Sequence, residues 1–369
     1  MKKIIFILTS LQDPHALKRI QEFAEKGSNF EVYGFSRNIG FGSQISVPYT
    51  ELGKMTNGTG YLSRLKFLGP VLRKLVQKYK NDDVVFFCFG LEIAFFIRLF
   101  SSKPYFYEEC DLMYTYLKFP LSLLEPIFKF IDRRLVASSH ESIFTSEGFV
   151  EYLYGDKVPK NLSVIANRLS NSILNMGWNN LPPKQVDIKK LRIGFNGSLC
   201  DKSVLRFAFT VAKNFPEISL TFNGTIQKFD DEYTKVLESL QMLPNVKFTG
   251  KFKNPDDLFK LHEDMDLLLC TYNTTFENVR RAEPNKLYEA IFFRTPIIVS
   301  SDTFLAKKVN KLNIGFEVDA DTPEKVKEFI NNLTSEIIET KSKACAEIPL
   351  SYCINNNDSF FQKINIFKE

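Results

Sequence analysis

A polar cluster near residue 285 combines side chains that can bind an anionic ligand. Pro284, Lys286 and Glu289 lie within the first two turns of a predicted helix. Proline suits the first helical position because it has no N–H group to leave unpaired. The next backbone N–H groups lack helical partners, and together with Lys286 they favour a phosphate-sized anion. Glu289 could then accept hydrogen bonds from sugar hydroxyls. A surface Lys–Glu pair on an ordinary helix explains the spacing equally well.

The composition describes a globular protein that is large enough for two domains. The chain has 369 residues, of which 44% are hydrophobic and 25% are charged. Six cysteines without a Cys-x-x-Cys pair, and only three histidines, argue against a zinc site and for a reducing compartment. No apolar run approaches the ~20 residues that a membrane span needs. We therefore expect a cytoplasmic protein.

The net charge of +5 comes from the first half of the chain. Residues 1–170 contain 22 Lys and Arg against 17 Asp and Glu. This excess is too small for a nucleic-acid-binding protein, but it predicts a local basic patch. The segment Tyr61–Lys80 carries six basic residues and no acid, with leucines between them. Such a helix could lie on an anionic membrane surface, or it could pack on the core with its charges in water.

Strand-like and helix-like segments alternate through both halves of the chain. Expected strands in the first half are residues 3–9, 30–35, 84–89, 104–107 and 142–145. Those in the second half are residues 191–195, 218–222, 246–249, 267–271, 297–299 and one ending at 318. This alternation predicts α/β architecture with doubly wound parallel sheets.

A segment rich in Asn, Gly and Pro separates the two halves. It covers residues 167–190 and is typical of a hinge. We therefore expect one domain at residues 1–170, a second at 171–350 and a closing helix within 351–369. Because ligands of such sheets bind at the carboxyl ends of the strands, the polar residues just after each strand are site candidates.

Several short motifs of the second half resemble those of the GT-B family 4 glycosyltransferases. These motifs are Gly194–Ser198, Asn245–Gly250, Asp264–Leu269, Glu283–Ala290 and Thr295–Ser300. Within the family, the chain is most similar to the capsule and surface-polysaccharide enzymes that contain Pro-Asn/Ser-Lys-Leu-x-Glu. The resemblance implies two Rossmann-like domains that face each other across a cleft, with the C-terminal helix packed back on the first domain.

The resemblance also implies roles for residues of the second domain. Glu289 would hold the donor ribose, and Glu283 would contact the donor sugar as a catalytic residue, because the position of the family's first glutamate is Arg281 here. The remaining donor-binding candidates are Gly197, Ser198, Arg206, Thr249, Gly250, Lys251, Asn285, Lys286 and Leu287. Lys202 would supply catalytic positive charge at the leaving diphosphate, a role that Arg206 shares as a candidate.

Three acidic residues and one histidine of the first half are candidates for the acceptor side. Glu108, Glu109 and Asp111 follow a predicted strand, and His15 lies in the first loop. A carboxylate there could take a proton from the acceptor hydroxyl or orient it, which makes Asp111 the catalytic candidate. Glu109 and His15 are assigned to acceptor contacts. Each of them could equally be a surface group.

The sequence thus predicts a retaining glycosyltransferase that moves a sugar from a nucleotide-sugar to a saccharide acceptor that is lipid-linked. We expect neither a metal nor another cofactor, no nucleic-acid partner, and peripheral attachment to the inner face of the cytoplasmic membrane through Tyr61–Lys80. A role in surface-polysaccharide synthesis follows from the resemblance. Two alternatives stay open, a nucleotide-sugar epimerase or hydrolase and a non-catalytic GT-B subunit.

Overall fold

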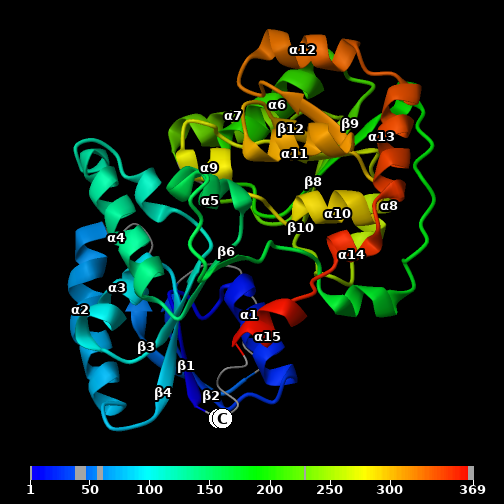
Figure 1. The fold of residues 1–369 in the computed structure, drawn as a ribbon. Helices are drawn as coiled ribbons and strands as arrows, with labels where there is room; N and C mark the ends of the chain where they lie inside the picture. Colours follow the sequence, from blue (N-terminus) through cyan, green and yellow to red (C-terminus); the bar gives the residue numbers. More distant parts are fainter. Residues whose placement is uncertain (1, 38–46, 56–60, 228–229, 365–369) are drawn as a thin grey trace. The chain divides into compact units, whose positions relative to one another are not determined.

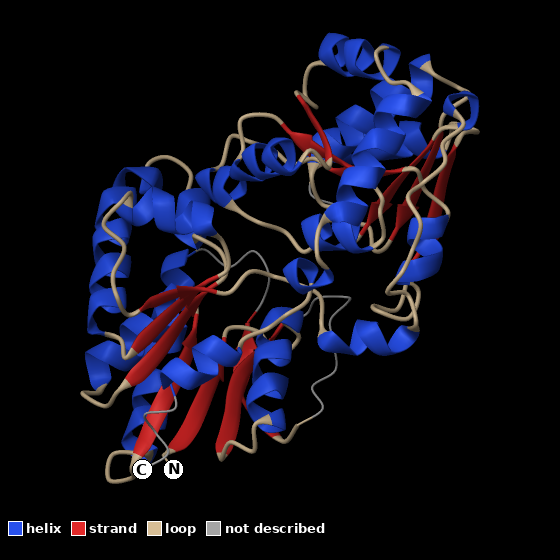
Figure 2. Ribbon diagram, turned by 45° about the vertical axis from the view of Figure 1, so that its right-hand side comes forward, coloured by secondary structure: helices blue, strands red, loops and turns tan. Residues whose placement is uncertain are grey.

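The computed structural model describes residues 2–37, 47–55, 61–227 and 230–364. The contacts within the chain divide it into two units. Unit 1 consists of Met1–Ala166 and Asn357–Glu369, and unit 2 consists of Asn167–Asn356. Each unit is built on one parallel β-sheet with helices against it (Figures 1 and 2).

The sheet of unit 1 has seven parallel strands in the order β3-β2-β1-β4-β5-β6-β7. The strands are β1 (Lys3–Leu8), β2 (Phe30–Arg37), β3 (Tyr49–Met55), β4 (Val84–Phe89), β5 (Tyr105–Glu109), β6 (Glu141–Phe144) and β7 (Leu162–Val164). The central strands are apolar and buried, as expected for a parallel sheet that is covered on both faces. The order reverses between β1 and β4, which is the usual ligand-binding position in such sheets.

The helices of unit 1 follow the strands in sequence. They are α1 (Pro14–Glu25), α2 (Tyr61–Lys78), α3 (Leu91–Phe100), η1 (Met113–Tyr116), η2 (Leu121–Leu124), α4 (Glu125–Ser138) and α5 (Glu147–Tyr154). Asp13 caps α1 by accepting a hydrogen bond from the His15 N–H at 3.0 Å, and Pro14 takes the first helical position. His15, which the sequence placed in the first loop, is therefore the second residue of α1 and lies beside Glu108 of β5.

The C-terminal segment returns to unit 1. Helix α15 (Asp358–Ile364) buries Phe360 and Ile364 in the core cluster of this unit. The ring of Phe361 packs edge-on against Phe23 of α1, with the ring centroids 5.0 Å apart. The sequence predicted a helix in this region, and the part of it beyond residue 364 lies outside the described residues.

The sheet of unit 2 has six parallel strands in the order β10-β9-β8-β11-β12-β13. These are β8 (Arg192–Asn196), β9 (Ser219–Asn223), β10 (Val246–Gly250), β11 (Leu267–Cys270), β12 (Ile297–Ser300) and β13 (Gly315–Val318). With β8 counted as the first strand, the order is 3-2-1-4-5-6, which is that of the Rossmann fold. The reversal point lies between β8 and β11.

The helices of unit 2 complete its two outer layers. They are η3 (Asn171–Met176), η4 (Ile188–Lys190), α6 (Lys202–Asn214), α7 (Asp231–Gln241), α8 (Leu258–Glu263), α9 (Glu277–Arg281), α10 (Lys286–Phe292), α11 (Phe304–Leu312), α12 (Pro323–Asn331), α13 (Ser335–Glu347) and α14 (Leu350–Cys353). A core cluster joins α6, α7 and α12 to one face of the sheet. All seven residues of α10 are buried, so this helix lies inside the unit rather than on its surface.

Two details of the sequence prediction around α10 are wrong. Pro284 is not the first helical residue, because Asn285 is the N-cap and the helix begins at Lys286. The N–H of Leu287 is also not free, since it donates to the carbonyl of Pro284 at 3.2 Å. The helix therefore begins two residues later than the position of the proline suggested.

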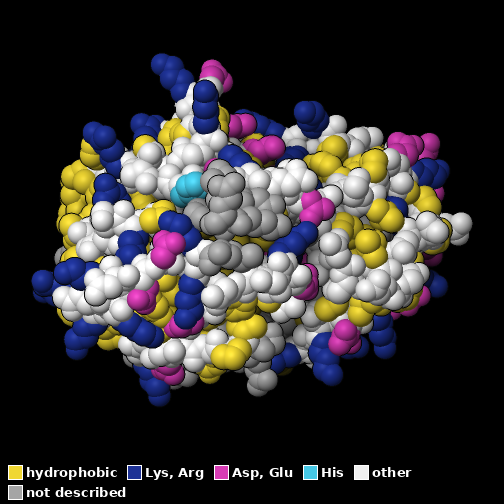
Figure 3. All heavy atoms as spheres, turned by 60° about the horizontal axis from the view of Figure 1, so that its bottom comes forward, with side chains coloured by type: hydrophobic (Ala, Val, Ile, Leu, Met, Phe, Trp, Pro, Cys, Tyr) yellow, Lys and Arg dark blue, Asp and Glu magenta, His cyan; other side chains and the backbone are white. Residues whose placement is uncertain are grey.

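Helix α2 packs on unit 1 through several of its leucines. Leu68, Leu72 and Leu75 are at most 5% exposed, and the helix contacts α3. Lys66 and Lys74 are exposed, so their charges face the solvent, as many Lys and Arg side chains of the protein do (Figure 3). Of the two interpretations of this basic segment, the core-packing helix therefore accounts for its leucines. Within the described residues, no helix is long and apolar enough to cross a membrane.

Candidate functional site

Two loops meet at the strand-order reversal of unit 2. The first follows β8 and contains Gly197, whose φ is 133°, a conformation that favours glycine. The second follows β11 and contains Asn273. Asp201, the N-cap of α6, joins these loops because its carboxylate accepts a hydrogen bond from the Asn273 N–H at 2.9 Å. The sheet topology therefore creates a ligand position whose walls are fixed to each other.

The side chain of Lys286, the first residue of α10, extends to this ligand position. Its side chain is 9% exposed. The Nζ atom donates to the Tyr272 hydroxyl at 3.2 Å and lies 5.1 Å from the centroid of the Phe195 ring. A Cβ built on Gly197 would be only 3.3 Å from this Nζ. A largely desolvated ammonium group therefore lies against the glycine turn, where an anionic ligand would interact with it strongly.

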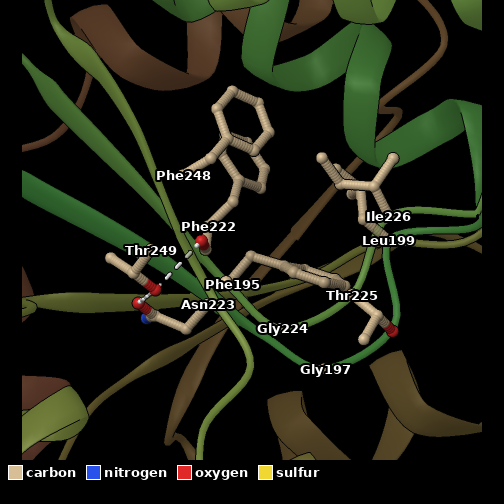
Figure 4. Close-up of a pocket in the computed structure, with 11 residues that line it drawn as sticks. Phe195, Gly197, Leu199, Phe222, Asn223, Gly224, Thr225, Ile226, Phe248 and Thr249 are labelled. Carbon is tan, nitrogen blue, oxygen red and sulfur yellow. Dashed lines mark hydrogen bonds between the residues drawn. The ribbon is translucent and has the colours of Figure 1, made fainter. Parts of the chain in front are cut away.

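A pocket of about 370 Å³ opens at the carboxyl ends of β8, β9 and β10 (Figure 4). Its lining residues are Phe195, Gly197, Leu199, Phe222, Asn223, Gly224, Thr225, Ile226, Phe248, Thr249 and Gly250. The Phe222 and Phe248 rings are stacked, with centroids 4.9 Å apart and an interplanar angle of 17°. An apolar pocket with a few polar groups is typical of a small-molecule site. Three of the predicted donor-binding residues, Gly197, Thr249 and Gly250, line it.

A chain of side-chain hydrogen bonds runs across the ends of the same three strands. The Thr249 hydroxyl donates to Asn223 Oδ1 at 2.7 Å, and Asn223 Nδ2 donates to Asn196 Oδ1 at 2.9 Å. Asn196 is 3% exposed, and its Nδ2 has no hydrogen-bond partner among the described residues. A buried donor without a partner is costly, so this atom can contribute to binding a polar ligand. Sequence reasoning missed Asn196 and Asn223 as site residues, although each directly follows a predicted strand and is the last residue of the observed one.

Gly224 provides a direct test of how closely the pocket walls approach each other. Its φ is 134°, and a Cβ on it would be 1.9 Å from the carbonyl oxygen of Gly197. We expect Gly224→Ala to separate the β8 and β9 turns, lower the melting temperature and weaken ligand binding. Gly177→Ala is the matched control, because Gly177 also has a positive φ of 78° but no atom within 4 Å of the added Cβ. Equal effects of the two variants, measured by thermal denaturation, would show that backbone strain alone is responsible.

Other predicted donor-binding residues lie around α10 and near the pocket. Glu289 is 3% exposed and accepts a hydrogen bond from Asn285 Nδ2 at 2.8 Å. Leu287 is fully buried and belongs to the packing of the unit. Ser198 follows the glycine turn and is half-buried, whereas Lys251 is exposed after β10. Their roles in donor binding stay predictions.

The two cations predicted at the diphosphate are engaged by carboxylates. Lys202 Nζ lies 2.9 Å from Asp230 and 2.7 Å from Glu232. Arg206 pairs with Glu232 at 2.7 Å and with Asp321 at 3.0 Å. The ion pairs with Asp230 and Glu232 connect α6 to the start of α7, and the ion pair with Asp321 connects it to the residues before α12. Within the described residues Lys286 contacts a hydroxyl and two aromatic rings rather than a carboxylate, so of these three cations it keeps the most charge for a ligand.

Glu283 occupies a buried position just before α10. One carboxylate oxygen accepts a hydrogen bond from the Tyr288 hydroxyl, and the other lies 2.7 Å from Lys308 Nζ of α11. Its side chain is 1% exposed. Arg281, at the position where the resemblance would place the first glutamate, pairs with Glu277 within α9 at 3.2 Å. Glu283 is therefore already a structural link between α10 and α11, and its contact with the donor sugar stays a prediction.

In unit 1, His15 and Glu108 meet at the carboxyl edge of the sheet. His15 Nε2 lies 2.6 Å from Glu108 Oε1, and the Arg19 guanidinium binds the same carboxylate at 3.1 Å. Burial acts to raise the pKa of Glu108, but Arg19 and His15 outweigh it and lower this pKa to about 2. Cys110 lies beside them, and its thiol and the ligand atoms of His15 and Glu108 fall within 4.8 Å of one another. Arg19 competes for the Glu108 oxygens in this trio.

Glu109 and Asp132 are two further buried carboxyl groups of unit 1, and they form an acidic pair. The Tyr107 hydroxyl lies 2.5 Å from Glu109 Oε2 and 3.0 Å from Asp132 Oδ1, so it joins the two carboxyl groups. Burial and the neighbouring Asp132 raise the pKa of Glu109 well above its usual range. Burial also raises the pKa of Asp132 to about 7, although the Tyr107 and Tyr114 hydroxyls oppose this. Asp111, in contrast, is exposed. It follows β5, the strand that ends with Glu109.

This acidic pair predicts a stability that falls as the pH rises. A carboxyl group whose pKa is raised by folding stabilises the native state below its unfolded pKa, and this contribution is lost as the pH passes through the folded value. For Asp132 the loss should therefore extend from about pH 4 to about pH 7. We expect Asp132→Asn, which mimics the protonated group, to flatten the melting temperature over this interval. An unchanged pH slope in the variant would contradict the assignment.

Comparisons with known proteins agree on the fold. HepE of Anabaena, solved in complex with UDP and glucose, has a TM-score of 0.66 and 16% identity, and the alignment covers 99% of this chain and 100% of that one. Sucrose-phosphate synthase of Thermosynechococcus elongatus gives a TM-score of 0.70 and 12% identity, with 99% and 98% covered. The lipopolysaccharide outer core galactosyltransferase WaaB gives 0.58 and 15%, with 98% and 99% covered.

No protein-family model and no curated sequence matches the chain. At identities of 12–16% the structural likeness establishes the architecture and not the substrate. It confirms the predicted fold class, in which each half of the chain carries its own parallel α/β sheet. The chain has the GT-B fold of glycosyltransferases.

Proposed function

We propose that the protein is a glycosyltransferase that uses a nucleotide-sugar donor. The observation that carries this proposal is the pocket at the ends of β8–β10 with Lys286 at its glycine turn. HepE, which shares the fold, has been solved with UDP and with UDP-glucose. An aromatic pocket beside a desolvated cation matches the two parts of such a donor, a flat base and a diphosphate.

The donor binds with its base in the aromatic pocket and its diphosphate against Lys286. The stacked rings of Phe222 and Phe248 supply apolar surface, while Asn223 and Thr249 supply polar groups to fix the orientation of the base. Negative charge grows on the diphosphate as the bond to the sugar breaks. Lys286 stabilises this charge more strongly than it stabilises the intact donor, which lowers the barrier.

The acceptor is a saccharide, and it binds to unit 1. Asp111 is exposed at the end of β5 and orients or deprotonates the acceptor hydroxyl, while His15 and Glu109 contribute to this side of the site. Glu283 and Lys202 complete the catalytic set implied by the resemblance. Retention of configuration, a lipid-linked acceptor at the inner face of the cytoplasmic membrane and a role in surface-polysaccharide synthesis rest on that resemblance alone, as does transfer without a metal.

A thermal-shift screen of nucleoside diphosphates and nucleotide-sugars tests the proposal. A ligand that binds only the folded state raises the melting temperature by mass action. We expect stabilisation by one nucleotide class, and less of it in Gly224→Ala than in Gly177→Ala. Consumption of the donor without any acceptor would instead indicate a hydrolase or epimerase. Tight donor binding without turnover in the presence of candidate acceptors would indicate a non-catalytic subunit, and no stabilisation by any nucleotide would contradict the proposal.

A further inference from the structure

A helical segment of unit 1 exposes large apolar side chains in a continuous row. Helix η2 ends at Leu124, and α4 begins at the next residue. Leu123, Ile127 and Phe130 are 68%, 55% and 58% exposed. Their spacing of four and three residues places them on one face of the segment. Phe119, which precedes η2, is 80% exposed. These four side chains define what we call the η2–α4 patch.

The fold does not use this row, because α4 packs on unit 1 with its opposite side. Asp132, Leu135 and Val136 are at most 4% exposed. The Phe128 ring stacks on the Tyr114 ring at a centroid distance of 6.0 Å. The helix is thus apolar on both sides, and only the inner side contributes to the core. A contiguous exposed apolar patch of this kind marks an interaction surface.

The exposed charged residues between positions 112 and 140, in the segment that carries the η2–α4 patch, are all positive. Lys118, Arg133 and Arg134 are exposed, and the Arg134 guanidinium lies 5.3 Å from the centroid of the Phe130 ring. No carboxylate between residues 112 and 140, all of which the structure describes, is exposed. Glu125 is half-buried and accepts a hydrogen bond from the Tyr152 hydroxyl, and Asp132 is buried.

We propose that the η2–α4 patch docks on an anionic lipid bilayer. Leu123, Ile127 and Phe130 enter the boundary between headgroups and acyl chains, while Lys118 and Arg134 meet lipid phosphates. The charge complementarity selects an anionic membrane over a protein partner, which would need an apolar face with an acidic rim. Helix α2, the expected membrane contact, exposes charge but less apolar surface, because Leu68, Leu72 and Leu75 are buried and Phe67 is 38% exposed. This inference goes beyond the proposed function, since docking requires no donor binding.

Vesicle co-sedimentation with the full chain tests the docking surface. The probes are phosphatidylcholine vesicles with and without phosphatidylglycerol. We expect binding only to the anionic vesicles, and a loss of at least about a hundredfold in Leu123→Ser/Ile127→Ser/Phe130→Ser, because the variant removes the inserted apolar groups. Lys118→Gln/Arg134→Gln should reduce binding by roughly fivefold per residue, with further loss at high salt.

The matched control removes two exposed charges from α2 instead. Lys66→Gln/Lys74→Gln changes the net charge by the same amount as Lys118→Gln/Arg134→Gln and should bind more tightly than it. The proposal is overturned if the folded serine variant still binds like the wild type, or if the α2 variant loses as much as the charge variant of the patch. A second result would also overturn the proposal. In that result the wild type sediments as a dimer, the serine substitutions dissociate the dimer, and neither the wild type nor any variant binds lipid. The nucleotide-induced thermal shift, which should persist in every variant, reports separately on the proposed function.

Discussion

Lys286→Met is expected to reduce kcat/KM for the nucleotide-sugar by about 10²–10³-fold, the loss typical when one group that stabilises developing negative charge is removed. Methionine keeps most of the volume of the buried side chain, so packing around Phe195 and Tyr272 should change little. The measurement is a steady-state assay, with the melting temperature as a check on folding. A larger fall in kcat than in donor affinity would show that the charge of Lys286 acts mainly by stabilising the transition state.

Two further lysine variants make this expectation specific. Lys307→Met removes an exposed charge from α11 of the same unit and should have little effect. Lys202→Met distinguishes the two candidate cations at the diphosphate, because Lys202 is paired with Asp230 and Glu232. A loss in Lys202→Met as large as that in Lys286→Met would show that Lys202, although paired with carboxylates, contributes equally at the diphosphate. An unaffected Lys286→Met enzyme would contradict the proposed donor position.

Arg19→Met should destabilise the protein by roughly 3–5 kcal/mol, because removing one partner leaves a buried charge uncompensated. Arg19 is 3% exposed and Glu108 is fully buried. Thermal or urea denaturation measures the effect. Arg98→Met, which removes an exposed arginine from α3, should stay close to the wild type. The double variant Arg19→Met/Glu108→Met should recover much of the loss, since it leaves neither charge unpaired.

The same ion pair has a defined pH dependence. Folding lowers the pKa of Glu108, so its contribution to stability is present above the ordinary glutamate pKa and is lost as the pH falls toward about 2. The wild type should therefore lose stability in acid through this group, and Arg19→Met should lose less over the same interval. Its sign is opposite to that of the Glu109–Asp132 pair. An Arg19→Met protein with an unchanged acid slope would contradict the role of Arg19.

The sequence was most informative where hydrophobic periodicity was strong. Val84–Phe89 matches its predicted range, because a continuous apolar run leaves little choice, and Val246–Gly250 differs from its predicted range by one residue. The edge strand β3 was missed. β3 has mostly exposed or half-buried residues, and its pairing with β2 rather than its own pattern makes it a strand. Helix α13 was also missed, although its N-cap Thr334 is of a residue type that favours helix starts.

For the candidate site, sequence motifs located the loops but not the contacts within them. Gly197, Thr249 and Lys286 were all identified, and they lie at the carboxyl edge of one sheet. The pairing of Lys202 with Asp230 and Glu232 joins residues about thirty positions apart, so no local pattern reveals it. The link between Asn196 and Asn223 likewise depends on the strand order, which a single sequence does not specify.

Hydrogen–deuterium exchange with and without the stabilising nucleotide tests the central claim most directly, because it reports where on the chain the ligand binds. The account predicts slower exchange in peptides covering residues 196–199, 222–226, 248–250 and 285–289, with little change in the strands of unit 1. At a subsaturating nucleotide concentration, protection of these segments should be weaker in Lys286→Met than in the wild type. Binding with protection confined to unit 1, or with none at the β8–β10 pocket, would contradict the assignment of the donor site.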